Sequence, residues 1–152
     1  MKYIKLSFLF FFLSFGFSVF GQYYQYAAHP EAINYYNEGV KAQTGGNSDD
    51  ALTAYQKALF LAHNDTKLQN RIINNMGIIY AKKGLVKQAE QAFKEVIFAD
   101  PDYRPAKVNL GLIYEQYGDR VMALEYWAEA LNWDNLKPKA FVVGETLEPE
   151  TN

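Results

Sequence analysis

The sequence predicts an all-α protein built as a stack of three helix–turn–helix units. Small and apolar residues recur at a spacing of 34, as between Gly77 and Gly111 or between Gly84 and Gly118. In each unit, apolar residues follow a helical period on both sides of a glycine that interrupts the pattern. The 152-residue chain contains no cysteine, so no disulfide framework competes with this interpretation.

The composition excludes several classes of function. Without cysteine the chain has no thiolate metal site, no cysteine nucleophile and no lipid anchor on an N-terminal cysteine. His29 and His63 are too few for a histidine metal cluster, and we interpret both as surface or packing residues. The formal charge of −2 disfavours nucleic-acid binding, which needs a basic surface. No catalytic or phosphate-binding motif is present, so we expect no enzyme activity, no metal and no cofactor.

The N-terminal segment, residues 1–21, is typical of a signal peptide. Lys2 and Lys5 precede an apolar run over residues 6–20, which is short for a membrane span of about 20 residues but fits a secretory leader. We expect cleavage after Gly21, which would leave 13 basic and 17 acidic residues. The cleavage region resembles signal peptides of Bacteroidota, which implies a periplasmic or secreted protein with no membrane contact. An uncleaved membrane anchor is the alternative.

The repeat can be followed through three units. The two later units share six small, apolar or aromatic positions, which pair as Met76 and Leu110, Gly77 and Gly111, Tyr80 and Tyr114, Gly84 and Gly118, Ala89 and Ala123, and Phe93 and Trp127. The first unit matches with Gly39, Gly46, Ala51 and Tyr55 at a spacing of 38. This larger spacing indicates four extra residues around 65–68.

These motifs resemble the tetratricopeptide repeat, a 34-residue helix–turn–helix unit. The units are residues 32–65, 70–103 and 104–137, preceded by a lead segment, 22–31, and followed by a tail, 138–152. Three residues depart from the family pattern. Val96 stands where the family has alanine, and His63 and Asn135 stand where it has proline. The resemblance implies a right-handed superhelical stack that binds a protein or peptide, as a non-catalytic adaptor or scaffold.

Glycine inside a helix costs about 1 kcal/mol, so the recurring Gly39, Gly77 and Gly111 indicate close helix packing. We expect the small partners on the second helices to be Ala51, Ala89 and Ala123. The aromatic residues Tyr55, Phe93 and Trp127 should fill the space towards the next unit.

Several local signals predict where the helices begin. His29-Pro30-Glu31 is typical of a helix start, and Asn47 could cap the second helix of the first unit. Asp65 or Thr66 could cap a longer helix that runs through residue 75.

The last unit has no following repeat to cover it. Its apolar Trp127, Leu131 and Trp133 are therefore candidates for an exposed patch through which copies could assemble. The alternative is that residues 140–143 fold back and seal the end.

The candidate binding surface is the concave face that first helices line in this family. The sixth residue of each unit faces this surface in the family, and here it is asparagine. The asparagine amide both donates and accepts hydrogen bonds and could hold an extended peptide. The alternative is an inherited consensus without present use. The predicted face comprises Ile33, Tyr36, Asn37, Val40, Arg71, Asn74, Asn75, Ile78, Val108, Asn109, Leu112, Glu115 and Gln116. The cationic clamp by which some members bind a terminal carboxylate is missing, so we exclude that role.

Overall fold

The computed structural model of the chain describes residues 29–131, and this part contains six helices and no strand. The predicted all-α repeat stack is thereby confirmed. The predicted signal peptide, most of the predicted lead segment and the predicted tail lie outside the described residues. The helices are α2 (Pro30–Thr44), α3 (Ser48–Leu61), α4 (Thr66–Lys82), α5 (Val86–Ala99), α6 (Arg104–Gln116) and α7 (Arg120–Leu131).

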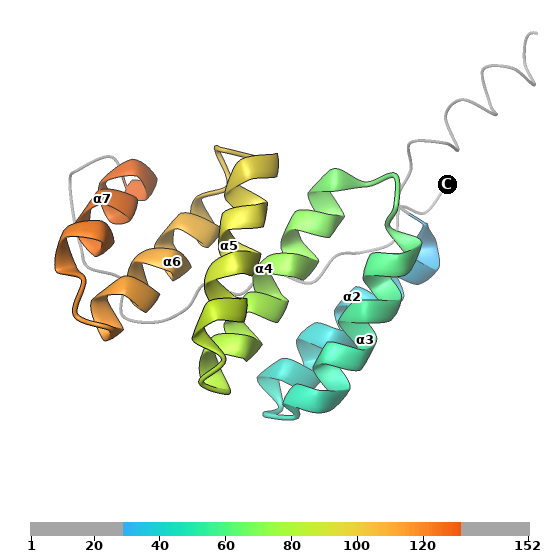
Figure 1. Cartoon of the computed structure of the whole chain (residues 1–152). Helices are drawn as coiled ribbons and strands as arrows, with labels where there is room; N and C mark the ends of the chain where they lie inside the picture. Colours follow the sequence, from blue (N-terminus) through green and yellow to red (C-terminus); the bar gives the residue numbers. More distant parts are fainter. Residues whose placement is uncertain (1–28, 132–152) are drawn as a thin grey trace, which may run out of the picture.

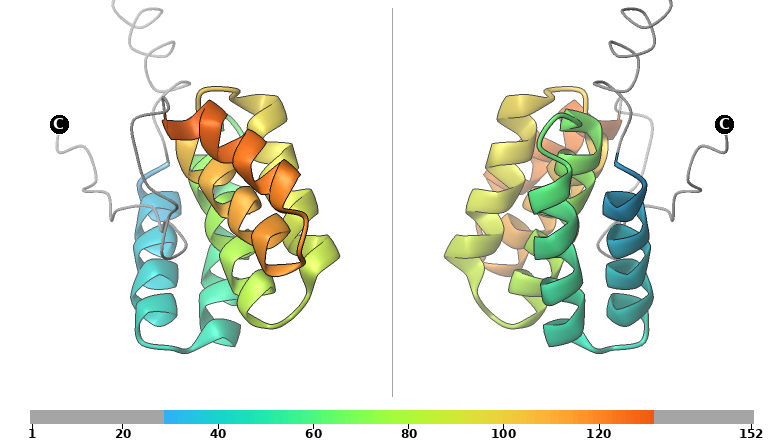
Figure 2. Two further views of the ribbon diagram at one scale, coloured as in Figure 1. Left: turned by 90° about the vertical axis from the view of Figure 1, so that its left-hand side faces the viewer. Right: turned by 90° about the vertical axis from the view of Figure 1, so that its right-hand side faces the viewer.

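The helices form three pairs that stack side by side, α2 with α3, α4 with α5, and α6 with α7 (Figure 1). The second helix of each pair contacts the first helix of the next, through α3 and α4 and through α5 and α6. The first helices α2, α4 and α6 also contact one another in sequence, whereas α3, α5 and α7 do not (Figure 2). Closer spacing on one side bends the stack, so the first helices form its concave side.

Local capping explains where two of the helices begin, as predicted. The Asn47 side chain accepts a hydrogen bond from the backbone N–H of Asp50 at 3.4 Å and caps α3. Asp65 caps α4 by accepting from the backbone N–H of Leu68 at 3.0 Å. The four extra residues of the first unit thus lengthen the start of α4. The turns after α2, α4 and α6 each contain a glycine with φ between +75° and +83°, namely Gly46, Gly84 and Gly118.

Each helix pair is held together by a glycine on its first helix and an aromatic ring on its second. A Cβ atom added to Gly77 would lie 2.7 Å from Cε1 of Phe93, and one on Gly111 would overlap the indole of Trp127. Gly39 has the same relation to Tyr55. The glycines are therefore packing sites, as predicted.

The predicted partners of these glycines were wrong. The aromatic ring, and not the small alanine, lies closest to the glycine, because the absent side chain leaves a recess that a flat ring fills. The rings therefore pack first within their own pair and do not serve only as wedges towards the next one. Ala51, Ala89 and Ala123 are nevertheless fully buried.

The expectation that Trp127 belongs to an exposed patch was also wrong. The indole is only 6% exposed, because it fills the recess over Gly111, and its N–H donates to the backbone oxygen of Val108 at 3.1 Å. The exposed apolar residues on α7 are Val121 and Leu124. Trp133 and the side chain of Leu131 lie outside the described part.

Candidate functional site

The structure places the predicted binding residues on α2, α4 and α6, the three helices of the concave side. Eight of the thirteen residues of the predicted face are buried, and six of these are Tyr36, Val40, Asn74, Asn75, Ile78 and Asn109. Four are half-buried, namely Asn37, Arg71, Leu112 and Glu115, and Gln116 is exposed. Ile33 and Val108, expected on the same face, are buried as well. Contact of this surface with a peptide stays a prediction.

Buried amides connect the second and third units directly. The Asn109 side chain on α6 donates from Nδ2 to Oδ1 of Asn74 on α4 at 3.0 Å. Asn74 in turn donates from Nδ2 to Oδ1 of its neighbour Asn75 at 3.4 Å. All three side chains are fully buried. Because a buried amide without a partner is costly, these contacts fix the register of α4 against α6.

The hydrogen-bonded chain continues from α4 into the first unit. Asn75 donates from Nδ2 to the hydroxyl oxygen of Tyr55 at 3.1 Å and lies 3.5 Å from that of Tyr36. The Tyr55 hydroxyl donates to Oε1 of Gln43 at 2.6 Å. The other end of this amide, Nε2 of Gln43, is buried and has no hydrogen-bond partner. We call the chain Asn109–Asn74–Asn75–Tyr55–Gln43 the amide–phenol chain.

Burial keeps the phenols of this region in their neutral form. Burial raises the pKa of Tyr55 well above its ordinary value, although the hydrogen bond from Asn75 acts in the opposite direction. Burial likewise raises the pKa of Tyr103 to about 12, and the nearby Tyr36 adds to this shift. Tyr55 therefore remains a hydrogen-bond donor at neutral pH.

Sequence reasoning missed the part that Gln43 and Tyr55 play here. Gln43 follows Ala32, Tyr36, Gly39 and Val40 at helical spacing on the buried stripe of α2. A glutamine that continues an apolar stripe is the signal that could have revealed it, because a buried amide requires a polar partner.

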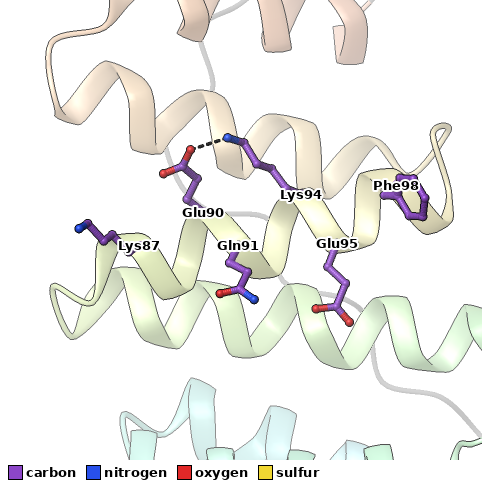
Figure 3. A pocket seen from close by; sticks show the side chains of 6 residues that line it. All are labelled: Lys87, Glu90, Gln91, Lys94, Glu95 and Phe98. Carbon is purple, nitrogen blue, oxygen red and sulfur yellow. Dashed lines mark hydrogen bonds and ion pairs between the residues drawn. The ribbon is translucent and has the colours of Figure 1, made fainter.

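A second candidate surface is a hollow of about 560 Å³ along the outer face of α5 (Figure 3). It is lined by Lys87, Glu90, Gln91, Lys94, Glu95 and Phe98. All six residues come from one helix and follow its solvent-facing stripe. The hollow is therefore a furrow between long surface side chains, in contrast to a site built by several elements.

The charged pair in this furrow has local partners. Lys94 forms an ion pair with Glu90 at 2.5 Å, and the Tyr114 hydroxyl donates to the same carboxylate at 2.8 Å. The Lys94 hydrogen bond, followed by that from Tyr114, lowers the pKa of Glu90. The contact between Tyr114 and Glu90 attaches α5 to α6.

Two features of the described part bear on other functions. Within residues 29–131 no group of three or more histidine, aspartate or glutamate side chains could hold a metal ion. None of the six helices combines the length and the apolar character that crossing a bilayer requires.

Comparison with known proteins shows what the repeat is similar to. The fold defines the chain as an all-α helical repeat protein, and residues 71–103 match the family model described as Tetratricopeptide repeat. The matched segment covers most of α4, all of α5 and the turn that follows, so the similarity lies in the second helix pair.

The chain is also similar to individual relatives and solved structures. The chain is 35% identical over 92 residues to the Photosystem I assembly protein Ycf3 of Synechococcus sp. strain CC9605, covering 60% of this chain and 53% of the relative. The crystal structure of MamA is 26% identical with a TM-score of 0.58, covering 71% of this chain and 58% of that one. The Sgt2 TPR domain of Aspergillus fumigatus has a TM-score of 0.61 at 23% identity, covering 70% and 68%. The chain spans about half the length of the curated relatives it matches.

Proposed function

We propose that the protein is a non-catalytic adaptor or scaffold that binds a peptide or protein segment along its concave side. The observation that carries this proposal is the amide–phenol chain, which runs through all three helix pairs and holds α2, α4 and α6 in one register. A surface preorganised in this way loses little conformational freedom when it binds a ligand. The similarity to an assembly protein supports the same class of function.

The chemistry of the concave side favours an apolar or extended segment over a charged one. Apolar side chains such as Leu112 alternate with amides, and Arg71 and Glu115 are the charged residues predicted there. Asn37 on α2 and Leu112 on α6 are half-buried, and Gln116 at the end of α6 is exposed. We therefore expect these rim residues to make the first contacts with a partner.

Site-specific photo-cross-linking tests this proposal. A photoreactive amino acid replaces Gln116 on the concave rim in one variant and Lys57 on α3, which is exposed on a second helix, in the control. In extracts of the host organism the Gln116 variant should capture a protein that the Lys57 variant does not. Leu112→Glu, which places a charge in the groove, should reduce this capture more than tenfold, whereas Phe60→Glu on α3 should not. Equal capture by all variants would contradict binding at the concave side.

We further propose that the protein is exported and matures by cleavage after Gly21. The basis is the leader-like sequence of residues 1–21, which lies outside the described residues. N-terminal sequencing of the protein from its host should then begin at Gln22, with or without cyclisation. An intact Met1 in the mature protein would favour the membrane-anchored alternative.

A second candidate function is a structural subunit that assembles through its C-terminal end. It is favoured by the exposure of Val121, Leu124 and Tyr117 on and next to α7. Measurement of the molecular mass in solution distinguishes this candidate from an adaptor.

A further inference from the structure

The two terminal first helices, α2 and α6, differ in their exposure to solvent. Along α2 the residues Asn34, Glu38 and Lys41 form an exposed stripe, as expected for a helix with no preceding repeat beside it. Helix α6 occupies the equivalent place at the other end of the stack, yet none of its residues from Pro105 to Glu115 is exposed. Helix α6 is therefore less exposed than α2, although residues such as Leu112 and Glu115 remain half-buried and keep some surface in contact with solvent.

Helix α4 is also shielded from solvent, since no residue from Leu68 to Ala81 is exposed. Leu68 and Ile72 pack against the first unit, and Ile78 packs with the core of the third. Arg71, Asn75 and Ile78 follow one another at helical spacing on α4. Asn75 and Ile78 are fully buried, because Asn75 bonds to Tyr55 of α3 and Ile78 joins the cluster that contains Phe93 of α5.

The path of the described chain shows on which side of the stack the segment after residue 131 starts. In the first two pairs, four residues lead from the second helix to the next first helix, over 62–65 and 100–103. The chain is thereby returned each time to the concave side. Helix α7 follows α6 as α3 follows α2 and α5 follows α4, so residue 131 ends its helix on the same side of the stack as Leu61 and Ala99 end theirs.

The length and chemistry of the segment that follows residue 131 fit this surface. Extended at about 3.3 Å per residue, residues 132–152 reach about 70 Å. The span from α6 across α4 to α2 is on the order of 20 Å at ordinary helix spacing. The segment carries the apolar run Phe141-Val142-Val143 and then three glutamates, which complement apolar residues of the concave side and the cationic Arg71 and Lys82 on α4.

We propose that residues 132–152 of the same chain lie along the concave side, over α6 and then α4, and occupy the groove until a partner displaces them. This inference rests on the proposed function of the groove and adds its regulation. An internal occupant is present at a high effective concentration, so it lowers the apparent affinity for any partner that uses the same surface. It also prevents segments that bind weakly from occupying the concave side.

Paramagnetic labelling tests this proposal directly, because the cysteine-free chain accepts one label at a chosen site. The chain from residue 22 to 152, with Thr146→Cys carrying a nitroxide, is compared with the same chain after reduction of the label. Methyl signals of Leu112 on α6 and Ile78 on α4 should lose at least half their intensity. Signals of Val86 on α5 should keep theirs. A label at Phe98→Cys, exposed on α5, serves as the control for label position and should not attenuate the Leu112 and Ile78 signals in this way.

Three further outcomes decide the proposal. Phe141→Asp combined with Val143→Asp in the labelled chain should restore the Leu112 and Ile78 signals, since charges remove the apolar contact. Attenuation confined to Val121 and Leu124 would show a tail that caps α7 and overturn the proposal, as would no attenuation at all. Attenuation in a mixture of labelled chain with separate isotope-enriched chain would identify a second copy as the occupant and also overturn it.

The labelling readout is independent of any partner. Its failure would therefore leave the photo-cross-linking test of the groove intact. Conversely, if Leu112→Glu does not affect partner capture even when the tail carries Phe141→Asp and Val143→Asp, the proposed function fails while the position of the tail stands.

Discussion

The Tyr55 hydroxyl donates to Oε1 of Gln43 at 2.6 Å, although the two residues lie on different helices and are twelve positions apart. The same hydroxyl accepts from Asn75 at 3.1 Å, so one phenol oxygen joins α2, α3 and α4. Since each member of the amide–phenol chain donates to the next, the last amide, that of Gln43, presents only its N–H groups. The Gln43 Nε2 group is buried without a partner, which marks the end of the chain.

The first prediction concerns the loss of this hydroxyl. Tyr55→Phe should lower the free energy of unfolding by about 1–3 kcal/mol, because the Asn75 donor and the Gln43 acceptor remain buried while their shared partner is removed. Urea denaturation followed by circular dichroism measures the change. Tyr117→Phe, at a residue that is 58% exposed, is the matched control and should stay within about 0.5 kcal/mol of the unsubstituted chain.

The raised phenol pKa values predict a loss of stability at alkaline pH. In the unfolded chain tyrosines lose their protons near pH 10, whereas Tyr55 and Tyr103 hold theirs to higher pH when folded. The contribution of these groups is therefore complete below about pH 10 and is lost as pH rises towards the folded pKa values, which for Tyr103 is about 12.

Denaturation at a series of pH values checks this dependence. Each phenol that ionises only on unfolding should lower the free energy of unfolding by up to about 1.4 kcal/mol per pH unit above pH 10. Tyr55→Phe should make the decline shallower than in the unsubstituted chain. Parallel declines for the two proteins would mean that Tyr55 does not titrate differently on unfolding.

The contact between Gly77 and Phe93 makes a further prediction. Gly77→Ala should destabilise the fold by about 1–3 kcal/mol despite the better helix propensity of alanine, because the new Cβ would lie 2.7 Å from the ring. In a Phe93→Leu background the same substitution should cost at least 0.5 kcal/mol less, since the smaller side chain yields space. Additive effects of the two substitutions would contradict a direct contact.

Local signals made most of the fold predictable from sequence. The glycines of the turns, the caps at Asn47 and Asp65, and the proline at the start of α2 act over a few residues, so the sequence alone reveals them. The residue that fills the recess over Gly111 could be recognised only from the three-dimensional packing. Both a ring and an alanine on the second helix could fill it, and only the packing shows that Trp127 does.

The candidate site was predictable to a smaller extent. The repeat placed Asn75 and Asn109 on the concave side, but it did not show that their amides bond to neighbours on other helices. Gln43 corresponds to Ala81 and Glu115 in the later units, so a repeat comparison could not show its role. A hydrogen-bonded chain between helices depends on side-chain reach across contacts, and that information is not contained in periodicity.

The last prediction concerns assembly through the C-terminal end. We expect the protein to be monomeric at micromolar concentration, because the exposed apolar residues of α7 are few and lie among charges. Val121 and Leu124 are 76% and 54% exposed, and Arg120 and Glu125 flank them directly in the sequence. Single apolar residues interrupted by charges are ordinary on soluble proteins, whereas stable dimers bury a continuous patch.

Analytical ultracentrifugation over a concentration series measures the mass. The double variant Val121→Lys, Leu124→Lys should sediment as the unsubstituted chain does, and a control with Phe60→Lys and Phe98→Lys on α3 and α5 should do the same. If the unsubstituted chain is a dimer and only the α7 variant is monomeric, α7 is instead an interface between copies. Such a result would favour the structural subunit over the adaptor, because the end of the stack would then be engaged by a second copy.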